Sequence, residues 1–169
     1  MSWAANSAMV ERAVVNASPI ILLSRVESLG LLRAVARAVY VPTAVAGEVN
    51  AKGGDDSVAR ALAEASWVQQ VVADDVPAPV AAWNLGAGES AVLAVACSMP
   101  GSHAILDDRE ARRCAAAFRV SAFGTIGVVL RAKRLGALPE VRPILDRLVA
   151  SGMFTTPELL RAAAASVGE

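Results

Sequence analysis

With 169 residues, of which 55% are hydrophobic and 4% aromatic, the chain is long enough for one domain whose core needs neither disulfide bonds nor a structural metal. Its 16 basic and 16 acidic side chains cancel, so the net charge gives no argument for a polyanionic partner. The absence of a bilayer-length apolar stretch and of a basic signal-peptide region predicts a cytoplasmic protein without a membrane partner.

Short β-branched runs alternate with amphipathic helical patterns along the chain, which is typical of parallel βαβ units. Strands are predicted at residues 13–16, 39–41, 67–72, 104–106 and 119–122. Ser18 is predicted to cap the first helix, and further helices are predicted from Pro42, from Asp55, and over 86–97, 108–118, 125–135, 140–150 and 156–167. The pattern predicts an α/β fold class with a doubly wound sheet.

We expect residues 1–169 to form a single domain. Residues 1–11 are predicted to be a flexible N-terminal extension, and residues 138–169 to form C-terminal helices that pack on the domain or extend it. The Pro- and Asp-rich segment 74–79 is interpreted as a surface connection, because neither side of it would hold a complete sheet.

Polar side chains follow the predicted strands at the edge where open parallel sheets bind ligands. Asn16 ends the first strand, and Asp107 and Asp108 follow the fourth. Glu48 lies on the flank of the apolar face of the second helix, and Glu89 lies in the first turn of a later helix on its core-facing stripe. We expect all five to reach one end of the central strands.

Each of these residues also has a purely structural interpretation. Glu89 could favour the positive end of its helix dipole, and one of the two aspartates could cap the helix that follows them. Glu48 could be a solvated helix residue, and Asn16 could form a turn. As a group they favour a cation site, because converging carboxylates repel one another unless a cation lies among them. Oxygen ligands without His or Cys select Mg²⁺ or Mn²⁺.

Several segments resemble the PIN-domain family in their order and spacing, and more narrowly the PIN-like branch related to bacterial toxin ribonucleases of the VapC type. They are VVNASPIILL, VYVPTAVAGEV, LGAGESAVLAVA, AILDDREARRCA and VSAFGTIGVVLRAKRLGALP, and the resemblance extends over residues 12–168. It implies a single PIN-like domain with a sheet of about five parallel strands flanked by helices. It also implies an acidic site that binds Mg²⁺ or Mn²⁺ and hydrolyses RNA, a homodimer, and an antitoxin protein as a partner.

The resemblance carries functional residues onto individual positions of this chain. It implies metal ligands at Asn16, Glu48, Glu89 and Asp108, a further catalytic carboxylate at Asp107, and hydroxyl groups close to the site at Ser18 and Thr125. Asn16 departs from the pattern, because the family usually has Asp there. An amide oxygen can bind a hard cation, but it brings no negative charge and cannot act as a base. We therefore expect weaker metal binding than in the family pattern.

Basic residues begin where the acidic ones end. Residues 48–108 hold nine acidic and two basic side chains, and residues 109–147 hold nine basic and three acidic ones. Arg109, Arg112 and Arg113 fall on one face of a predicted helix that starts beside the acidic residues. This stripe could bind an RNA backbone, and it could equally be an ordinary solvated face.

The sequence therefore favours a metal-dependent endoribonuclease, which could be the toxin of a toxin–antitoxin pair. A non-catalytic PIN-like module that binds RNA or protein stays open because of Asn16. A hydrolase for a small molecule also stays open, although the arginine stripe does not support it.

Overall fold

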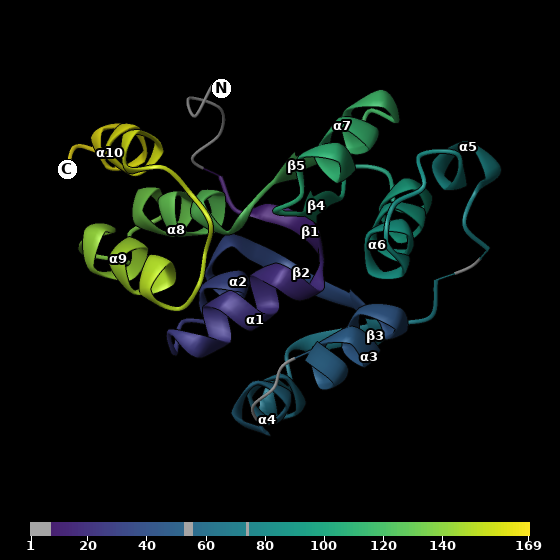
Figure 1. Cartoon of the computed structure of the whole chain (residues 1–169), viewed down its shortest axis with the longest axis horizontal. Coiled ribbons are helices and arrows are strands. Elements are labelled where there is room, and N and C mark those ends of the chain that lie inside the picture. The colour runs from purple at the N-terminus through teal and green to yellow at the C-terminus, as the bar shows by residue number, and fades with distance from the viewer. Residues whose placement is uncertain (1–7, 53–55, 74) are drawn as a thin grey trace.

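The protein is built on one parallel β-sheet. The computed structural model describes residues 8–52, 56–73 and 75–169, with the elements labelled in Figure 1. The sheet has five strands in the order β3-β2-β1-β4-β5, and every neighbouring pair is parallel. The strands are β1 (Val10–Val15), β2 (Ala36–Pro42), β3 (Val68–Val71), β4 (His103–Ile105) and β5 (Ser121–Phe123). The predicted α/β class with five parallel strands is confirmed.

The central strand β1 explains where a ligand site can form. Val14 of β1 pairs with Tyr40 of β2 on one side and with Ala104 of β4 on the other. Its neighbours Ala13 and Val15 are fully buried, as expected for a parallel strand covered on both faces. The chain moves from β1 outward through β2 and β3, and then returns to the other side of β1 for β4 and β5. This reversal leaves a crevice at the carboxyl ends of β1 and β4.

Helices cover both sides of this sheet. In Figure 1, α6 and α7 lie to the right of the sheet, and α8, α9 and α10 lie to its left. The helix bounds are α1 (Ala17–Arg25), α2 (Leu31–Val35), α3 (Thr43–Lys52), α4 (Asp56–Glu64), α5 (Ala78–Ala81), α6 (Ala87–Ser98), α7 (Arg109–Ala117), α8 (Thr125–Arg134), α9 (Arg142–Ala150) and α10 (Pro157–Ala165). Among the described helices, none is long and apolar enough to cross a membrane.

A second apolar cluster fixes the C-terminal helices. Leu22 of α1, Leu130 of α8, Leu145 and Leu148 of α9 and Ala163 of α10 are buried together in it. The guanidinium of Arg25, at the end of α1, also donates a hydrogen bond to the carbonyl of Ser151, 3.3 Å away. The loop between α9 and α10 is therefore held beside α1.

Several boundaries differ from those predicted. Strand β1 begins at Val10, so Val10 and Glu11 belong to the sheet, while residues 1–7 of the expected flexible extension lie outside the described residues. Helix α1 begins at Ala17 with Asn16 as its extended N-cap residue, so the prediction that Ser18 caps this helix is wrong. Ser18 lies inside the first turn, and its hydroxyl reaches another element.

Other differences have local causes. Strand β5 begins at Ser121 because Arg119 adopts a left-handed conformation (φ 58°) that closes the end of α7. The short helices α2 and α5 were not predicted, because four or five residues show too little periodicity. Helix α5 overlaps the segment interpreted as a surface connection, in which residue 74 lies outside the described residues. Asp55, the predicted start of the third helix, also lies outside them, and α4 begins at Asp56.

Candidate active site at the carboxyl edge of the sheet

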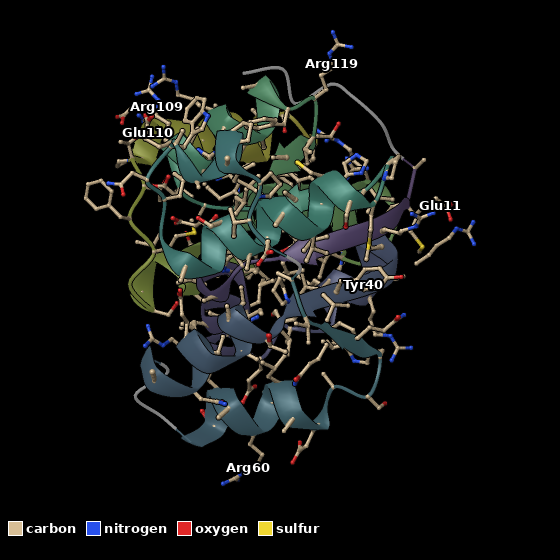
Figure 2. All side chains as sticks on the ribbon, turned by 90° about the vertical axis from the view of Figure 1, so that its right-hand side faces the viewer. Glu11, Tyr40, Arg60, Arg109, Glu110 and Arg119 are labelled. Atoms are coloured by element: carbon tan, nitrogen blue, oxygen red, sulfur yellow. The ribbon has the colours of Figure 1, made fainter. Side chains whose placement is uncertain are left out.

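A cleft of about 910 Å³ opens at the carboxyl ends of β1 and β4. Side chains from α1, α3, α6 and α7 line it, together with residues that follow the strands and the loop between α9 and α10. Of the predicted site residues, it brings together Asn16, Ser18, Glu48, Glu89, Asp107, Asp108, Arg109 and Arg112. Thr125 lies buried behind the wall, and Arg113 does not line the cleft. In Figure 2, Arg109 marks this side of the molecule, and Glu11 of β1 lies on the opposite side.

Asn16 and Glu48 face the same point in space. The backbone N–H of Gly88 donates a 2.8 Å hydrogen bond to Oε1 of Glu48. A Cβ atom built on Gly88 would lie 2.8 Å from that oxygen and 3.0 Å from Oδ1 of Asn16. Asn16 is 6% exposed, and its Oδ1 is buried without a hydrogen-bond partner among the described residues. A buried acceptor without a donor is costly, so this oxygen is suited to accept from, or bind to, a ligand of the cleft.

Glu89 is turned toward the start of its own helix. Its Oε2 accepts a 3.0 Å hydrogen bond from the backbone N–H of Gly86, the N-cap residue of α6. The interpretation of Glu89 as a residue that stabilises the helix N-terminus therefore holds for this oxygen. The side chain still lines the cleft.

Both carboxylate oxygens of Asp107 accept hydrogen bonds. Its Oδ1 accepts from the backbone N–H of Thr125 at 2.7 Å. Its Oδ2 accepts from Oγ1 of Thr125 at 2.7 Å and from Oγ of Ser18 at 3.2 Å. A Cβ on Gly124 would lie 2.6 Å from Oδ1, so this close approach requires glycine. Asp107 thus ties the end of β4 to α8 and α1, and both hydroxyl groups named by the resemblance serve it.

Asp108 is the N-cap residue of α7. Its Oδ1 accepts a 2.8 Å hydrogen bond from the backbone N–H of Ala111. The side chain is exposed, and its second oxygen has no hydrogen-bond partner in the described part of the chain. Of the two adjacent aspartates, Asp108 is the cap, and it keeps one oxygen available to a ligand.

The three arginines of the predicted stripe have separate roles. Arg112 donates to the backbone carbonyls of Leu106 and Asp107 and so fixes the end of β4. Arg113 pairs with Glu110 at 3.0 Å on the solvent side. Arg109 is exposed and lines the cleft, and no described residue pairs with it. Of these three arginines, Arg109 alone is placed to bind a phosphate group without first losing an interaction with a described residue.

The sequence did not indicate the rest of the cleft. Arg25 lines it about two turns after Ser18 on the same face of α1. This spacing is the signal for Arg25 in the sequence. Apolar side chains come from β5, α8, α10 and the loop before α10, and they are Phe123, Ile126, Met153, Phe154 and Leu159. No spacing in the sequence links that loop to the acidic residues, because the second apolar cluster places it.

Phe123 forms part of the apolar wall and rests on a cation. The guanidinium carbon of Arg131 lies 5.0 Å from the centroid of its ring, and the ring of His103 lies edge-on at 6.1 Å. Burial, followed by the charge of Arg131, lowers the pKa of His103, and a backbone hydrogen bond opposes this only in part. His103 therefore stays neutral near pH 7 and supports the wall from outside the cleft.

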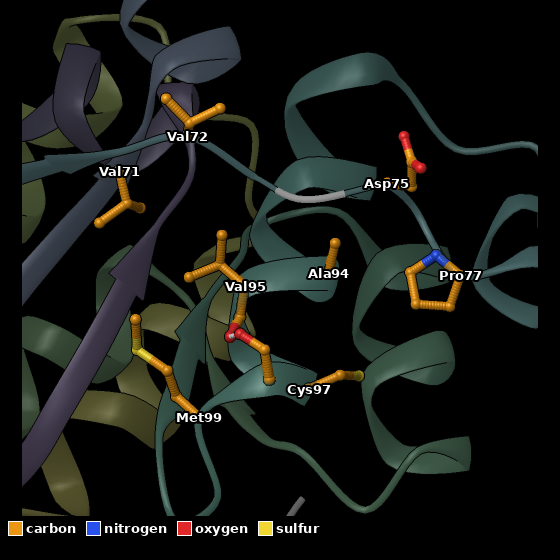
Figure 3. A pocket seen from close by; sticks show the side chains of 9 residues that line it. Val71, Val72, Asp75, Pro77, Ala94, Val95, Cys97 and Met99 are labelled. Atoms are coloured by element: carbon orange, nitrogen blue, oxygen red, sulfur yellow. Dashed lines mark hydrogen bonds between the residues drawn. The ribbon is translucent and has the colours of Figure 1, made fainter.

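A smaller hollow of about 450 Å³ lies between the end of β3 and α6 (Figure 3). Its lining is mainly apolar, with Val71, Val95 and Met99 among the side chains, and Asp75 is the one carboxylate among the described residues that line it. Cys97 also lines it, and burial raises the pKa of this thiol. None of the predicted site residues lies there.

The polar side chains at the carboxyl ends of β1 and β4 offer oxygen donors to a cation, namely those of Asn16, Asp107 and Asp108, and Glu48 and Glu89 add further carboxylate oxygens. Within the described residues, no three His, Cys, Asp or Glu side chains are grouped closely enough to hold a metal ion together. Each of the four carboxylates accepts a hydrogen bond from a backbone N–H group at the start of a helix, which offsets part of the repulsion among them. The unpartnered Oδ1 of Asn16 beside Oε1 of Glu48 still fits a hard divalent cation.

Comparisons with known proteins give one family and no individual relative. A family model described as "DUF3368: PIN domain" matches residues 12–169. No curated protein and no solved structure matches the chain.

Proposed function

The chain belongs to the PIN-domain family, and from this premise we propose that it is an endoribonuclease that uses Mg²⁺ or Mn²⁺ to hydrolyse RNA phosphodiester bonds. The observation that carries the proposal is the buried Oδ1 of Asn16, which has no partner and faces the same point as Oε1 of Glu48. Three further carboxylates line the same cleft. This is the donor chemistry that a hard cation requires.

In this proposal each residue of the cleft has a separate role. Asn16 and Glu48 hold the cation, and the second oxygen of Asp108 contributes negative charge to it. A bound divalent cation supplies charge neutralisation at the scissile phosphate and lowers the pKa of an attacking water. Arg109 binds a phosphate of the RNA backbone. Asp107 acts as a positioning residue, because its hydrogen bonds to Ser18 and Thr125 join α1, β4 and α8 around the cleft.

The experiment measures cleavage of a 5′-labelled single-stranded RNA by the purified protein with Mn²⁺, with Mg²⁺ and with EDTA. We expect cleavage with either metal and none with EDTA. Glu48→Gln and Asp108→Ala should abolish it. The matched control is Asp146→Asn, an exposed carboxylate of α9 outside the cleft, which should cleave like wild type.

A second candidate function is a non-catalytic module that binds RNA or a protein. It is favoured by the missing charge at Asn16 and by the lack of a three-carboxylate group among the described residues. If wild type neither binds Mn²⁺ in calorimetry nor cleaves RNA, while Asn16→Asp does both, this second candidate is correct.

The resemblance to VapC-type toxins supports a cellular role. We propose that the protein acts in the cytoplasm as a homodimeric toxin that an antitoxin neutralises. Expression of the wild-type chain alone should then slow growth, and expression of Glu48→Gln should not. Equal growth of the two strains at equal protein levels would contradict the toxin role.

A further inference from the structure

One aromatic side chain at the cleft is exposed without a structural reason. Phe154 is 100% exposed and lines the cleft that holds the carboxylates. The other exposed large apolar side chains in the described part of the chain are aliphatic, namely Met9, Val72 and Val149. A fully exposed phenyl ring contributes nothing to the core, and single exposed apolar residues are common on protein surfaces, so a functional role for Phe154 depends on the groups around it.

The segment that carries Phe154 is anchored at both ends. Gly152, in the left-handed region (φ 103°), closes α9, and the hydroxyl of Thr156 caps α10 by accepting from the N–H of Leu159. Met153 packs on the second apolar cluster, and Arg25 holds the carbonyl of Ser151. The ring is therefore presented from a short, fixed segment.

The surroundings of the ring match the parts of a nucleotide. Arg25 and Arg109 are exposed and line the same cleft, which supplies positive charge for phosphate groups. Phe154, Met153 and Leu159 supply an apolar surface for a base, while the carboxylates lie in the same cleft. A protein partner could use the apolar part, but the combination of two arginines, an exposed ring and an acidic site favours a polynucleotide.

We infer that Phe154 stacks on an unpaired base of the RNA that enters the cleft. This inference rests on the proposed function. A paired base is stacked within its helix and offers no free face, whereas a base of a single strand can be splayed onto an aromatic side chain. Removal of such a ring weakens binding by about 5- to 100-fold, in line with measured base–aromatic stacking.

The test measures binding of a fluorescein-labelled RNA oligonucleotide by anisotropy in EDTA, so that no cleavage occurs. Phe154→Ala should bind the single strand about 5- to 100-fold more weakly, and Phe154→Trp should bind at least as tightly as wild type. The control Val72→Ala truncates an exposed apolar side chain outside the cleft and should bind like wild type. A duplex, or a strand of abasic nucleotides, should bind equally to wild type and Phe154→Ala.

The outcomes separate this inference from the nuclease proposal. Metal-free binding that depends on the ring, without any cleavage when Mn²⁺ is added, supports the role of Phe154 and contradicts the nuclease. Cleavage by wild type with equal single-strand affinity in Phe154→Ala overturns the role of Phe154 alone. Equal affinity together with a change in oligomeric state on gel filtration also overturns it, because Phe154 would then be a subunit contact. No RNA binding by wild type would overturn it as well.

Discussion

Asn16→Asp is the substitution that most directly tests whether residue 16 faces Glu48 in the cleft. The two side chains have almost the same shape, so the perturbation is one negative charge. Oδ1 of Asn16 and Oε1 of Glu48 lie 3.0 and 2.8 Å from the same point, so the new charge would face an existing one. At a separation of about 5 Å and an effective dielectric constant of about 20, two like charges repel by about 3 kcal/mol.

Without divalent cations, we therefore expect Asn16→Asp to lower the free energy of unfolding by up to about 3 kcal/mol at neutral pH. Repulsion raises the pKa of one carboxyl group of the pair, so the loss should shrink as the pH falls and that group takes up a proton. With Mn²⁺ the same charge becomes favourable. We expect Mn²⁺ affinity to rise at least about tenfold, which corresponds to about 1.4 kcal/mol.

The assay combines urea unfolding in EDTA and in excess Mn²⁺ with calorimetric titration of Mn²⁺. The control Asn84→Asp adds the same charge in the exposed loop before α6, outside the cleft, and should leave both measurements unchanged. If Asn16→Asp has the stability of wild type in EDTA and also binds Mn²⁺ with wild-type affinity, then residue 16 does not face Glu48 as we describe.

Three further changes have defined outcomes. Gly88→Ala should destabilise the fold by about 1–3 kcal/mol in urea unfolding, because its Cβ would overlap two side-chain oxygens, whereas Gly47→Ala, with open space around it, should stabilise α3 by up to about 1 kcal/mol. Thr125→Val removes a buried donor to Asp107 and should cost about 1.5–3 kcal/mol, while Thr125→Ser should retain most of the stability. Burial acts to raise the pKa of Glu169, but hydrogen bonds from two backbone N–H groups at the start of α9 and an ion pair with a lysine leave it lowered. Its contribution is therefore present at neutral pH and lost as the pH falls through the lowered pKa, so the melting temperatures of wild type and Glu169→Gln should differ at neutral pH and converge in acid.

The sequence predicted the structure best where the residues of a single strand or helix determine its conformation and burial. The run Ala13-Val14-Val15 is apolar without alternation, which a strand covered on both faces requires, and it forms the centre of the sheet. The candidate site residues that directly follow strands could also be predicted from the sequence, because parallel strands end at one edge of the sheet. Their position depends on topology alone.

The sequence was least informative where a contact joins distant segments. Asp107 and Asp108 are identical neighbours, and only the contact of Asp107 with Thr125 distinguishes the inner carboxylate from the helix cap. Gly88 and Gly124 look like ordinary helix-start glycines, although each leaves room for an acidic side chain. Phe154 reaches the cleft only because α9 and α10 pack on α1 and α8.

The four carboxylates of the cleft share one structural feature that affects how strongly the stability of the fold depends on a bound metal ion. Each accepts a hydrogen bond from a backbone N–H group at the start of α6, α7 or α8, where the helix dipole favours negative charge. Three helix N-termini thus stabilise these negative charges through their backbone N–H groups. The amide of Asn16 lies beside these carboxylates, and its Oδ1 has no such partner among the described residues, but it brings no charge that must be neutralised. Wild type should therefore keep its melting temperature when metal is removed with EDTA, whereas Asn16→Asp should lose stability under the same treatment. A large drop for wild type would show that a cation, and not the helix N-termini, holds the acidic cleft together.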